Sequence, residues 1–473
     1  MSVRRRHWIA VISALVAVWA VWLLEGARWG ISFERFDLRE TPAVRMSDGT
    51  GGPVVVLAHG FAGSWQMMQG YGLVLAQAGY DVYAFDFLGH GQHPVPMSGD
   101  VTAVDGTTRL LVDQTIEVIE AVRGARPVAL VGHSMATDVL VRAAAQAEGI
   151  GPLVLLATFS GAVTPEFPDD MLLITGAWEP RLQGFANDAV AEAAEGVRRK
   201  AMIAPAVEHV AILHSRAGRA AALAWLNESY GREQTAPVPQ TGWALLGLLA
   251  AITVLFGPVA RAFPARPVET VPLSPRGFAL AVVGPMLAAP LLAWPVETSV
   301  LPVLVADYLA LHLALYGVLQ LAVLWWLCGP PGRISPLGAA LVLIWTIGVF
   351  GFALHRYGAN FWPSPERLAI IAALSLGAVP FMLADNWLVH DARMGRRVLA
   401  RLGFLVSLAI AVALDFEGLF FLILIAPVIV LFYVSFGRVG RVSAARYGAG
   451  GAGLALGLAL AWALGVSFPL FQA

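Results

Sequence analysis

Cysteine and charged residues are both scarce in this sequence of 473 residues. The single cysteine, Cys328, excludes an intramolecular disulfide, and no Cys/His cluster has the spacing of a zinc site. Only 13% of the residues are Asp, Glu, Lys or Arg, whereas a soluble globular protein has about a quarter. Lys and Arg (31) nearly balance Asp and Glu (32), so no strong field attracts nucleic acid. The sequence therefore gives no indication of a metal, an organic cofactor or a nucleic-acid partner.

Long apolar runs take the place of the missing charge, and hydrophobic residues make up 58% of the sequence. The first run covers residues 8–24 and follows three arginines at positions 4–6. It has the length of either a signal peptide or a short membrane anchor, and its end lacks the small-residue pattern of a cleavage site. We therefore expect an uncleaved N-terminal transmembrane anchor over residues 8–24.

A second series of apolar runs fills residues 242–473. Each run is near the ~20 residues that a helix needs to cross a bilayer. The series predicts a polytopic membrane domain of about eight helices, with membrane lipids as its surroundings. The predicted spans cover residues 243–260, 277–296, 303–327, 337–354, 368–389, 402–414, 417–436 and 449–470.

Arginines predict how these spans are oriented, because loops that stay in the cytoplasm carry an excess of Lys and Arg. If residues 4–6 are cytoplasmic, the number of spans puts the arginine clusters at 393–401 and 438–446 on the same side. The loop that contains Arg356 and Arg367 is an exception. We expect an integral, multi-pass membrane protein whose segment between the first two spans lies on the extracytoplasmic side.

Residues 31–235, between those two spans, differ from the rest because charged residues are frequent and apolar runs are short. Strand-like runs alternate there with longer helical stretches. This alternation is typical of a mostly parallel sheet with helices on both faces, so we expect a water-soluble α/β domain. The strand-like runs are Val54–Ala58, Asp81–Phe85, Val128–Val131, Leu153–Ala157 and Met171–Thr175.

A candidate nucleophile lies in residues 131–136, whose sequence is Val-Gly-His-Ser-Met-Ala. Small residues on both sides of a serine allow a sharp turn from a strand to a helix, and that turn projects the hydroxyl group from the sheet. The pattern is close to G-x-S-x-G, with Ala136 in place of the second glycine. It predicts that Ser134 is a catalytic nucleophile.

An oxyanion-binding loop is predicted where the run Val54–Ala58 leads directly into His59, Gly60 and Phe61. A tetrahedral intermediate of acyl transfer needs two preorganised N–H donors where its negative charge develops. We expect the backbone N–H groups of Phe61 and Met135 to be these donors. His59 is expected to be a turn residue without a catalytic proton.

A serine hydroxyl group is a poor nucleophile at neutral pH and needs a general base. We expect His209 to be this base, because it precedes an amphipathic helix, whereas the alternative, His214, would lie in or at the start of that helix. The carboxylate that orients the histidine is expected to be Glu179, which follows a strand-like run. Asp169 and Asp170 precede the same run, so we expect them to be solvated loop charges at the opposite edge of the sheet.

Residues 84–91, Ala-Phe-Asp-Phe-Leu-Gly-His-Gly, resemble a D-x-x-G-H-G loop that follows a strand of the α/β-hydrolase superfamily. The serine turn and the order Ser134, Glu179, His209 are also similar to that superfamily, especially to its lysophospholipase-like and serine-aminopeptidase-like members. The resemblance covers about residues 40–231, less than half of the chain. It implies the α/β-hydrolase fold and the hydrolysis of an ester, a thioester or an amide. An alanine replaces the second glycine of the common pattern, and Glu179 replaces an aspartate.

These residues predict a membrane-bound serine hydrolase that cleaves acyl esters, with lipid-like esters as the expected substrates. An acyltransferase of the same fold, or a transporter or receptor with a non-catalytic hydrolase-like domain, are the alternatives. The chain between residues 157 and 171 leaves room for only a short loop, so we expect the membrane domain, rather than a lid, to help cover the site. Asp307 and His312 lie within or near one predicted span and are candidates for a second site.

Overall fold

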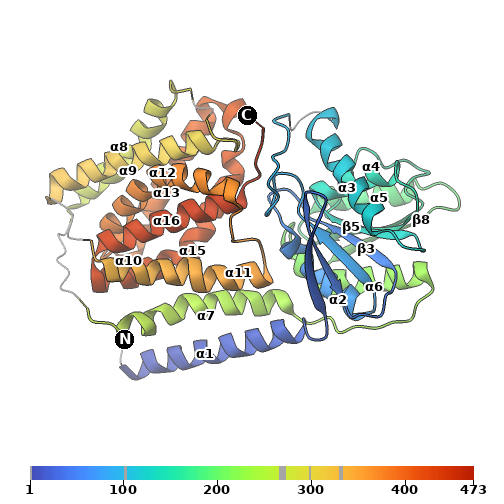
Figure 1. Ribbon diagram of the computed structural model, residues 1–473. Coiled ribbons are helices and arrows are strands. Elements are labelled where there is room, and N and C mark those ends of the chain that lie inside the picture. Colours follow the sequence, from blue (N-terminus) through green and yellow to red (C-terminus); the bar gives the residue numbers. More distant parts are fainter. Residues whose placement is uncertain (1–2, 101–103, 266–272, 298–299, 330–333, 473) are drawn as a thin grey trace.

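The computed structural model describes residues 3–100, 104–265, 273–297, 300–329 and 334–472, and it contains an α/β domain beside a helical bundle (Figure 1). Helix α1 (Val3–Gly26) precedes the α/β domain but lies along the bundle. It packs against α7 (Thr241–Arg261), the first helix after the α/β domain. The segments that enter and leave the α/β domain are therefore neighbours in space.

The α/β domain is built on a sheet that has eight strands in the described residues, in the order β1-β2-β4-β3-β5-β6-β7-β8. Strands β3 to β8 are parallel to one another, whereas β1 and β2 pair antiparallel at one edge. The expected mostly parallel sheet is confirmed. The strands are β1 (Ser32–Leu38), β2 (Thr41–Ser47), β3 (Val54–Ala58), β4 (Asp81–Phe85), β5 (Val128–His133), β6 (Ile150–Leu156), β7 (Asp170–Gly176) and β8 (Arg198–Ala204).

Helices cover both faces of this sheet, because alternate residues of each central strand point to opposite sides. Val55 and Leu57 belong to the core under α2 and α6, whereas Val56 and Ala58 belong to the core under α3, α4 and α5. All four side chains are fully buried, which explains why the sequence of this central strand is apolar at every position. The helices are α2 (Trp65–Gln77), α3 (Arg109–Val122), α4 (Met135–Ala144), α5 (Pro180–Ala191) and α6 (Arg216–Tyr230).

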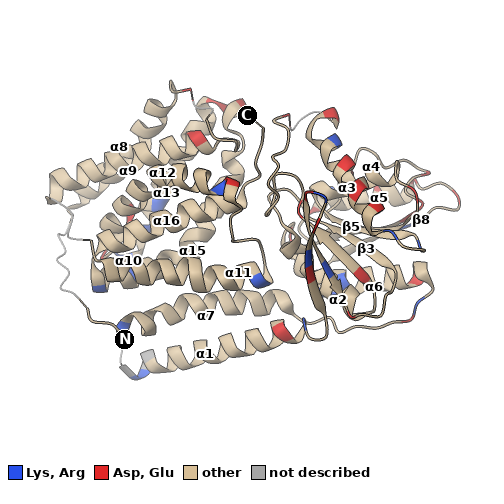
Figure 2. Ribbon diagram, viewed as in Figure 1, with Lys and Arg blue, Asp and Glu red and all other residues tan. Residues whose placement is uncertain are grey.

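The helical bundle is poor in charge along most of its length, whereas charges of both signs are scattered over the α/β domain (Figure 2). Among the described residues, nine helices, α1 included, are long and apolar enough to cross a membrane. The other helices of the bundle are α8 (Pro275–Ala293), α9 (Ala306–Cys328), α10 (Pro336–Leu343) with η3 (Ile344–Phe350) and α11 (Gly351–Tyr357), α12 (Pro365–Val389), α13 (Met394–Leu414), α14 (Phe416–Leu419), α15 (Leu422–Tyr447) and α16 (Ala449–Ser467).

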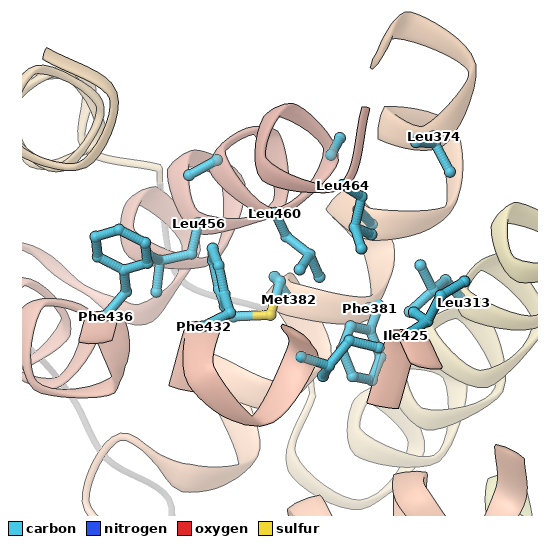
Figure 3. Close-up of a cluster of buried hydrophobic side chains, with 14 of the residues drawn as sticks. Leu313, Leu374, Phe381, Met382, Ile425, Phe432, Phe436, Leu456, Leu460 and Leu464 are labelled. Atoms are coloured by element: carbon cyan, nitrogen blue, oxygen red, sulfur yellow. The ribbon is translucent and has the colours of Figure 1, made fainter. Parts of the chain in front are cut away.

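Large apolar side chains fill the space between α9, α12, α15 and α16 (Figure 3). Leu313, Phe381 and Leu460 are almost completely buried there. Helices α12 and α16 approach closely, since a Cβ atom added to Gly457 would lie 2.6 Å from the Cα atom of Val379. Only a residue without a side chain allows two backbones to pass at this separation.

Two predicted spans differ most from the structure in their limits. The span predicted at 402–414 is part of α13, which already begins at Met394. The span predicted at 417–436 is divided, because α14 is a separate short helix and α15 continues to Tyr447. Arginines do not end these helices, since Arg401 of α13 lies inside the bundle with its guanidinium 3.3 Å from the carboxylate of Asp385.

Arginines gather at the end of the bundle that lies away from the α/β domain (Figures 1 and 2). Arg446 donates a hydrogen bond to the carbonyl oxygen of Phe263 at 2.8 Å, and Arg396 donates to that of Leu273 at 3.0 Å. These contacts bring the ends of α7, α8, α13 and α15 together. The helices also carry Arg261, Arg276, Arg393, Arg438 and Arg441 at or near these ends.

Candidate active site

Ser134 lies at the sharp turn between β5 and α4. Its backbone φ is 53°, a left-handed conformation that non-glycine residues seldom adopt. The turn is tight, because a Cβ atom added to Gly132 would lie 2.5 Å from Leu140 Cδ1. Ala136 is fully buried, so its methyl group fits where the common pattern has a second glycine. The local backbone is that of a strand-turn-helix unit that presents a serine.

The structure brings the side chains of Ser134, His209 and Glu179 together. His209 Nε2 is 2.7 Å from Ser134 Oγ, and His209 Nδ1 is 2.6 Å from Glu179 Oε1. Glu179 Oε2 accepts a hydrogen bond from the Gly176 N–H at 2.8 Å, which fixes the carboxylate at the end of β7. The Glu179 side chain is only 8% exposed, whereas that of His209 is 44% exposed. This arrangement can remove the proton of the serine hydroxyl and pass it to a bound group.

His133 holds the loop that carries His209. Its Nε2–H donates a hydrogen bond to the carbonyl oxygen of His209 at 2.7 Å, and burial lowers the pKa of His133 to about 4. The alternative base, His214, lies in the short helix η2 (Ala211–His214), where its Nδ1 has no partner in the described part of the chain. Of the two candidate bases, His209 is the one that contacts Ser134.

The loop after β3 packs directly against the serine turn. A Cβ atom added to Gly60 would lie 2.8 Å from His133 Nδ1 and 3.1 Å from Ser134 Cβ, so only glycine allows this approach. Phe61 follows this glycine, and Met135 follows the serine. Within the described residues, neither the Phe61 N–H nor the Met135 N–H donates to a protein acceptor. Both groups are therefore available to an oxygen atom of a ligand beside Ser134.

His59 is a fully buried link between two loops rather than an ordinary turn residue. Its Nδ1–H donates to the carbonyl oxygen of Gly60 at 2.8 Å, and its Nε2 accepts from the Phe87 N–H at 3.1 Å. Burial lowers the pKa of His59 to about 4, so the ring is neutral at pH 7 and can make both bonds. His59 thus ties the loop after β3 to the loop after β4.

The loop after β4 contains the D-x-x-G-H-G sequence and supports Phe61. Asp86 accepts hydrogen bonds from the Trp65 N–H at 2.8 Å and from the Gln92 N–H at 2.9 Å. The ring of His90 lies 5.7 Å from the ring of Phe61, measured between centroids. The motif shapes a loop that packs on the predicted oxyanion loop.

The helical bundle contacts the loop after β3 at Phe61 and at Ser64. The ring centroid of Phe421 lies 6.0 Å from that of Phe61, and Ser64 Oγ accepts a hydrogen bond from the Asn360 N–H at 2.9 Å. Residues 157–169, between β6 and β7, form an irregular loop without a helix. The bundle therefore contacts the loop after β3, and the α/β domain has no helix between β6 and β7.

Asp307 and His312, the candidates for a second site, each have a structural partner. The Asp307 carboxylate accepts hydrogen bonds from the N–H groups of Val300 and Leu301, both at 2.8 Å. His312 Nε2 is 3.0 Å from Ser407 Oγ, which joins α9 to α13. Among the described residues, no group of three His, Cys, Asp or Glu side chains is arranged to hold a metal ion. These contacts give the two residues roles at a helix start and between two helices.

His133 and Arg367 support the site, and no sequence motif predicts these roles. His133 acts on the His209 loop, and Arg367 of α12 donates a hydrogen bond from Nη2 to the carbonyl oxygen of Gly89 at 2.7 Å. Both bind backbone carbonyl groups far away in the chain, and no motif marks such a pair. Asp170, expected to be a solvated loop charge, is instead the first residue of β7 and pairs with Arg198 at 2.8 Å.

Residues 53–261 match the model of a family described as alpha/beta hydrolase fold. No curated protein matches this chain. Similar solved structures include a CIB-like hydrolase from Thermoplasma acidophilum (15% identity, 42% of this chain and 98% of that chain, TM-score 0.35). Others are an epoxide hydrolase from an endophytic Streptomyces (15%, 43% and 97%, TM-score 0.34) and a membrane phospholipase A described as a bacterial virulence factor (14%, 46% and 93%, TM-score 0.33). Each of these matches takes in less than half of this chain.

Proposed function

We propose that this protein, whose N-terminal domain has the α/β-hydrolase fold, is a membrane-bound serine hydrolase that cleaves acyl esters. The observation that carries the proposal is the hydrogen-bonded series from Ser134 through His209 to Glu179, with 2.7 Å and 2.6 Å between successive atoms. A domain that only bound a ligand would not need a base and a buried carboxylate aligned on one hydroxyl group.

In the proposed reaction, Ser134 Oγ attacks the carbonyl carbon of the ester while His209 Nε2 takes the hydroxyl proton. Glu179 stabilises the resulting imidazolium and keeps Nδ1 protonated. The N–H groups of Phe61 and Met135 donate to the oxyanion. His209 then returns the proton to the leaving alcohol, and an acyl-enzyme remains. Water attacks this acyl group with His209 as the base, which releases the acid and restores the Ser134 hydroxyl.

Apolar side chains around the triad favour an apolar substrate. Trp178 and Val210 directly flank Glu179 and His209 in the sequence, and they are 68% and 50% exposed. Phe159, whose N–H contacts Thr137 at the start of α4, is 69% exposed. A group of large, solvent-exposed apolar side chains is typical of a surface that binds a ligand or a membrane. Lipid-like acyl esters are therefore the substrate class that we propose.

The helical bundle supplies the membrane part of the proposal. Helices of 19 to 26 residues match the ~20 residues that cross a bilayer. The arginine-rich end of the bundle is assigned to the cytoplasm, since positive charge accumulates in cytoplasmic loops. The α/β domain, at the other end, is then extracytoplasmic, and its serine lies near the outer surface of the membrane.

Hydrolysis of p-nitrophenyl butyrate by the detergent-solubilised full chain tests this function. We expect Ser134→Ala and His209→Ala to lower kcat/KM by at least about 10⁴-fold, because the serine and its base act as a unit. His214→Gln is the matched control, since that histidine does not contact Ser134, and its activity should equal the wild type. Activity that persists in Ser134→Ala would contradict the mechanism. Product that forms only with an added acyl acceptor would identify an acyltransferase instead.

A further inference from the structure

Four phenylalanine rings form a continuous row between the surface of the bundle and the serine loops. The ring centroids of Phe416 and Phe420 are 5.8 Å apart, those of Phe420 and Phe421 are 5.8 Å apart, and those of Phe421 and Phe61 are 6.0 Å apart. We call Phe416, Phe420, Phe421 and Phe61 the aromatic row. Three of its members come from residues 416–421, the connection between α13 and α15.

One end of the aromatic row lies at the predicted oxyanion loop. Phe61 contributes both its ring to the row and its free N–H to the space beside Ser134. The backbone of Gly60 packs against Ser134 so closely that an added Cβ atom would lie 3.1 Å from Ser134 Cβ. An acyl group bound to Ser134 with its oxygen at the Phe61 N–H would therefore contact the residue that carries the first ring of the row.

The other end of the aromatic row is open. Phe416 is 60% exposed and Phe420 is 43% exposed, and Ile423 and Leu424 at the start of α15 are exposed as well. Asp415 and Glu417 are exposed beside these rings, so in the proposed membrane orientation this surface lies at the boundary between lipid headgroups and acyl chains. The row thus continues from this surface to Phe61 in the loop that packs on the serine turn.

We infer that the aromatic row is the acyl-chain subsite of this protein and that it selects long-chain acyl esters drawn from the bilayer over short, water-soluble esters. The inference rests on the proposed hydrolase function, which it extends to a substrate class. Its physical basis is the transfer of methylene groups from water to apolar surface, which is worth about fourfold in binding for each group fully buried. Short esters gain little from the row because their chains end beside Phe61.

The test compares the rates at which a short and a long alkyl fluorophosphonate, ethyl and dodecyl, inactivate the detergent-solubilised full chain. We expect Phe421→Ala to lower the ratio of the dodecyl rate to the ethyl rate by about tenfold, since a whole ring of the subsite is lost. Phe420→Ala should lower the same ratio by about threefold, and it does not touch the oxyanion loop directly. Phe352→Ala is the control, because this phenylalanine is also exposed on the bundle but lies in α11, outside the row.

Three outcomes would overturn the inference. A ratio that stays unchanged in both row variants would show that the rings do not bind the chain. An equal fall of both rates would show that the rings only position Phe61. A well-folded wild type that reacts with neither probe would remove the proposed function, and the acyl-chain subsite with it.

Discussion

At the scale of single residues, five histidines of the α/β domain are kept neutral by their surroundings. Burial lowers the pKa of His59, His93, His133 and His214 to about 4, and the pKa of His90 lies well below its usual value. Two of them, His59 and His133, make hydrogen bonds to the loops on either side of Ser134 through neutral rings. Protonation of His59 would remove the Nε2 lone pair that accepts the Phe87 N–H, so it is incompatible with the bond between these two loops.

These histidines predict that the protein loses stability in mild acid. An unfolded histidine takes up its proton near pH 6.5, whereas the folded ones do so only near pH 4, so the unfolded chain binds more protons between these values. The free energy of unfolding should fall by up to about 1.4 kcal/mol per pH unit for each histidine. Asp86 opposes this in part, because burial raises its pKa to about 6 and its folded form gains a proton first.

Thermal unfolding of the detergent-solubilised chain between pH 8 and pH 4.5 measures this effect. We expect Tm to be constant above about pH 7 and to fall steadily below pH 6.5. His214→Gln should flatten the fall, since it removes one of the groups concerned. A Tm that stays level or rises from pH 6.5 to pH 5 would contradict the assignment of neutral histidines.

The residues of the candidate site could largely be located from the sequence. Ser134 and Glu179 each follow an apolar strand, and parallel strands end at the same edge of the sheet, so the sequence predicts that both side chains lie at that edge. The support of the site could not be found in this way. The bond from His133 to the carbonyl oxygen of His209, at 2.7 Å, depends on the exact path of a loop. Sequence spacing contains no information on such a path.

At the scale of elements, the C-terminal segment and α12 hold the loop after β4. The Leu470 N–H donates to the carbonyl oxygen of Gly89 at 2.9 Å, and the Gln472 N–H donates to that of Met97. Gly89 has a φ of 70°, and an added Cβ atom would lie 2.4 Å from the carbonyl oxygen of Leu470. Arg367, fully buried, donates to the same Gly89 carbonyl. The bundle thereby fixes a loop that packs on Phe61.

Replacing Arg367 should destabilise the whole protein. In Arg367→Met, the carbonyl groups of Gly465 and Phe468 lose their donor, and each unsatisfied buried group costs about 1–3 kcal/mol. We expect the free energy of unfolding to fall by about 2–4 kcal/mol. The matched control is Arg356→Met, which breaks a part-exposed ion pair with Glu25 and should cost only about 0–1 kcal/mol. Equal Tm values for the two variants would contradict this role of Arg367.

The central strands were predictable because they are buried on both faces and read as apolar runs, whereas β1, β2 and β8 were missed. These strands lie at or next to the edges of the sheet, and β1 and β8 have exposed, charged residues such as Glu34 and Lys200. The predicted limits of α13 and α15 were wrong because these helices contain arginines, which hydropathy places outside a membrane span. Arginines inside these helices find partners such as Asp385, which hydropathy alone does not reveal.

At the scale of the whole molecule, Arg356 and Arg367 have partners beside the α/β domain. They are the two arginines in a loop that is predicted to be extracytoplasmic. Arg356 lies 2.5 Å from the carboxylate of Glu25, and Arg367 binds backbone carbonyl groups. Because each is held by a specific contact, neither weakens the argument that the arginine-rich far end is cytoplasmic. The α/β domain and the far end should therefore lie on opposite sides of the membrane.

Cysteine labelling in intact cells tests this orientation. In a Cys328→Ser background, we expect Glu148→Cys, exposed on the α/β domain, to react with a membrane-impermeant maleimide. Gly395→Cys, exposed at the far end of the bundle, should react only after the cells are permeabilised. The reverse pattern would place the α/β domain in the cytoplasm and contradict the proposed access to the outer leaflet.

The central claim is that Ser134 is an activated nucleophile, and labelling by a fluorophosphonate probe tests it most directly. The measurement is peptide mapping of the labelled, detergent-solubilised full chain, with Ser134→Ala and His209→Ala beside the wild type. We expect the label on Ser134 in the wild type, none in Ser134→Ala, and at least about a 100-fold slower reaction in His209→Ala, because the hydroxyl then lacks its base. A folded wild type that takes no label, or carries it on another residue, would contradict the account.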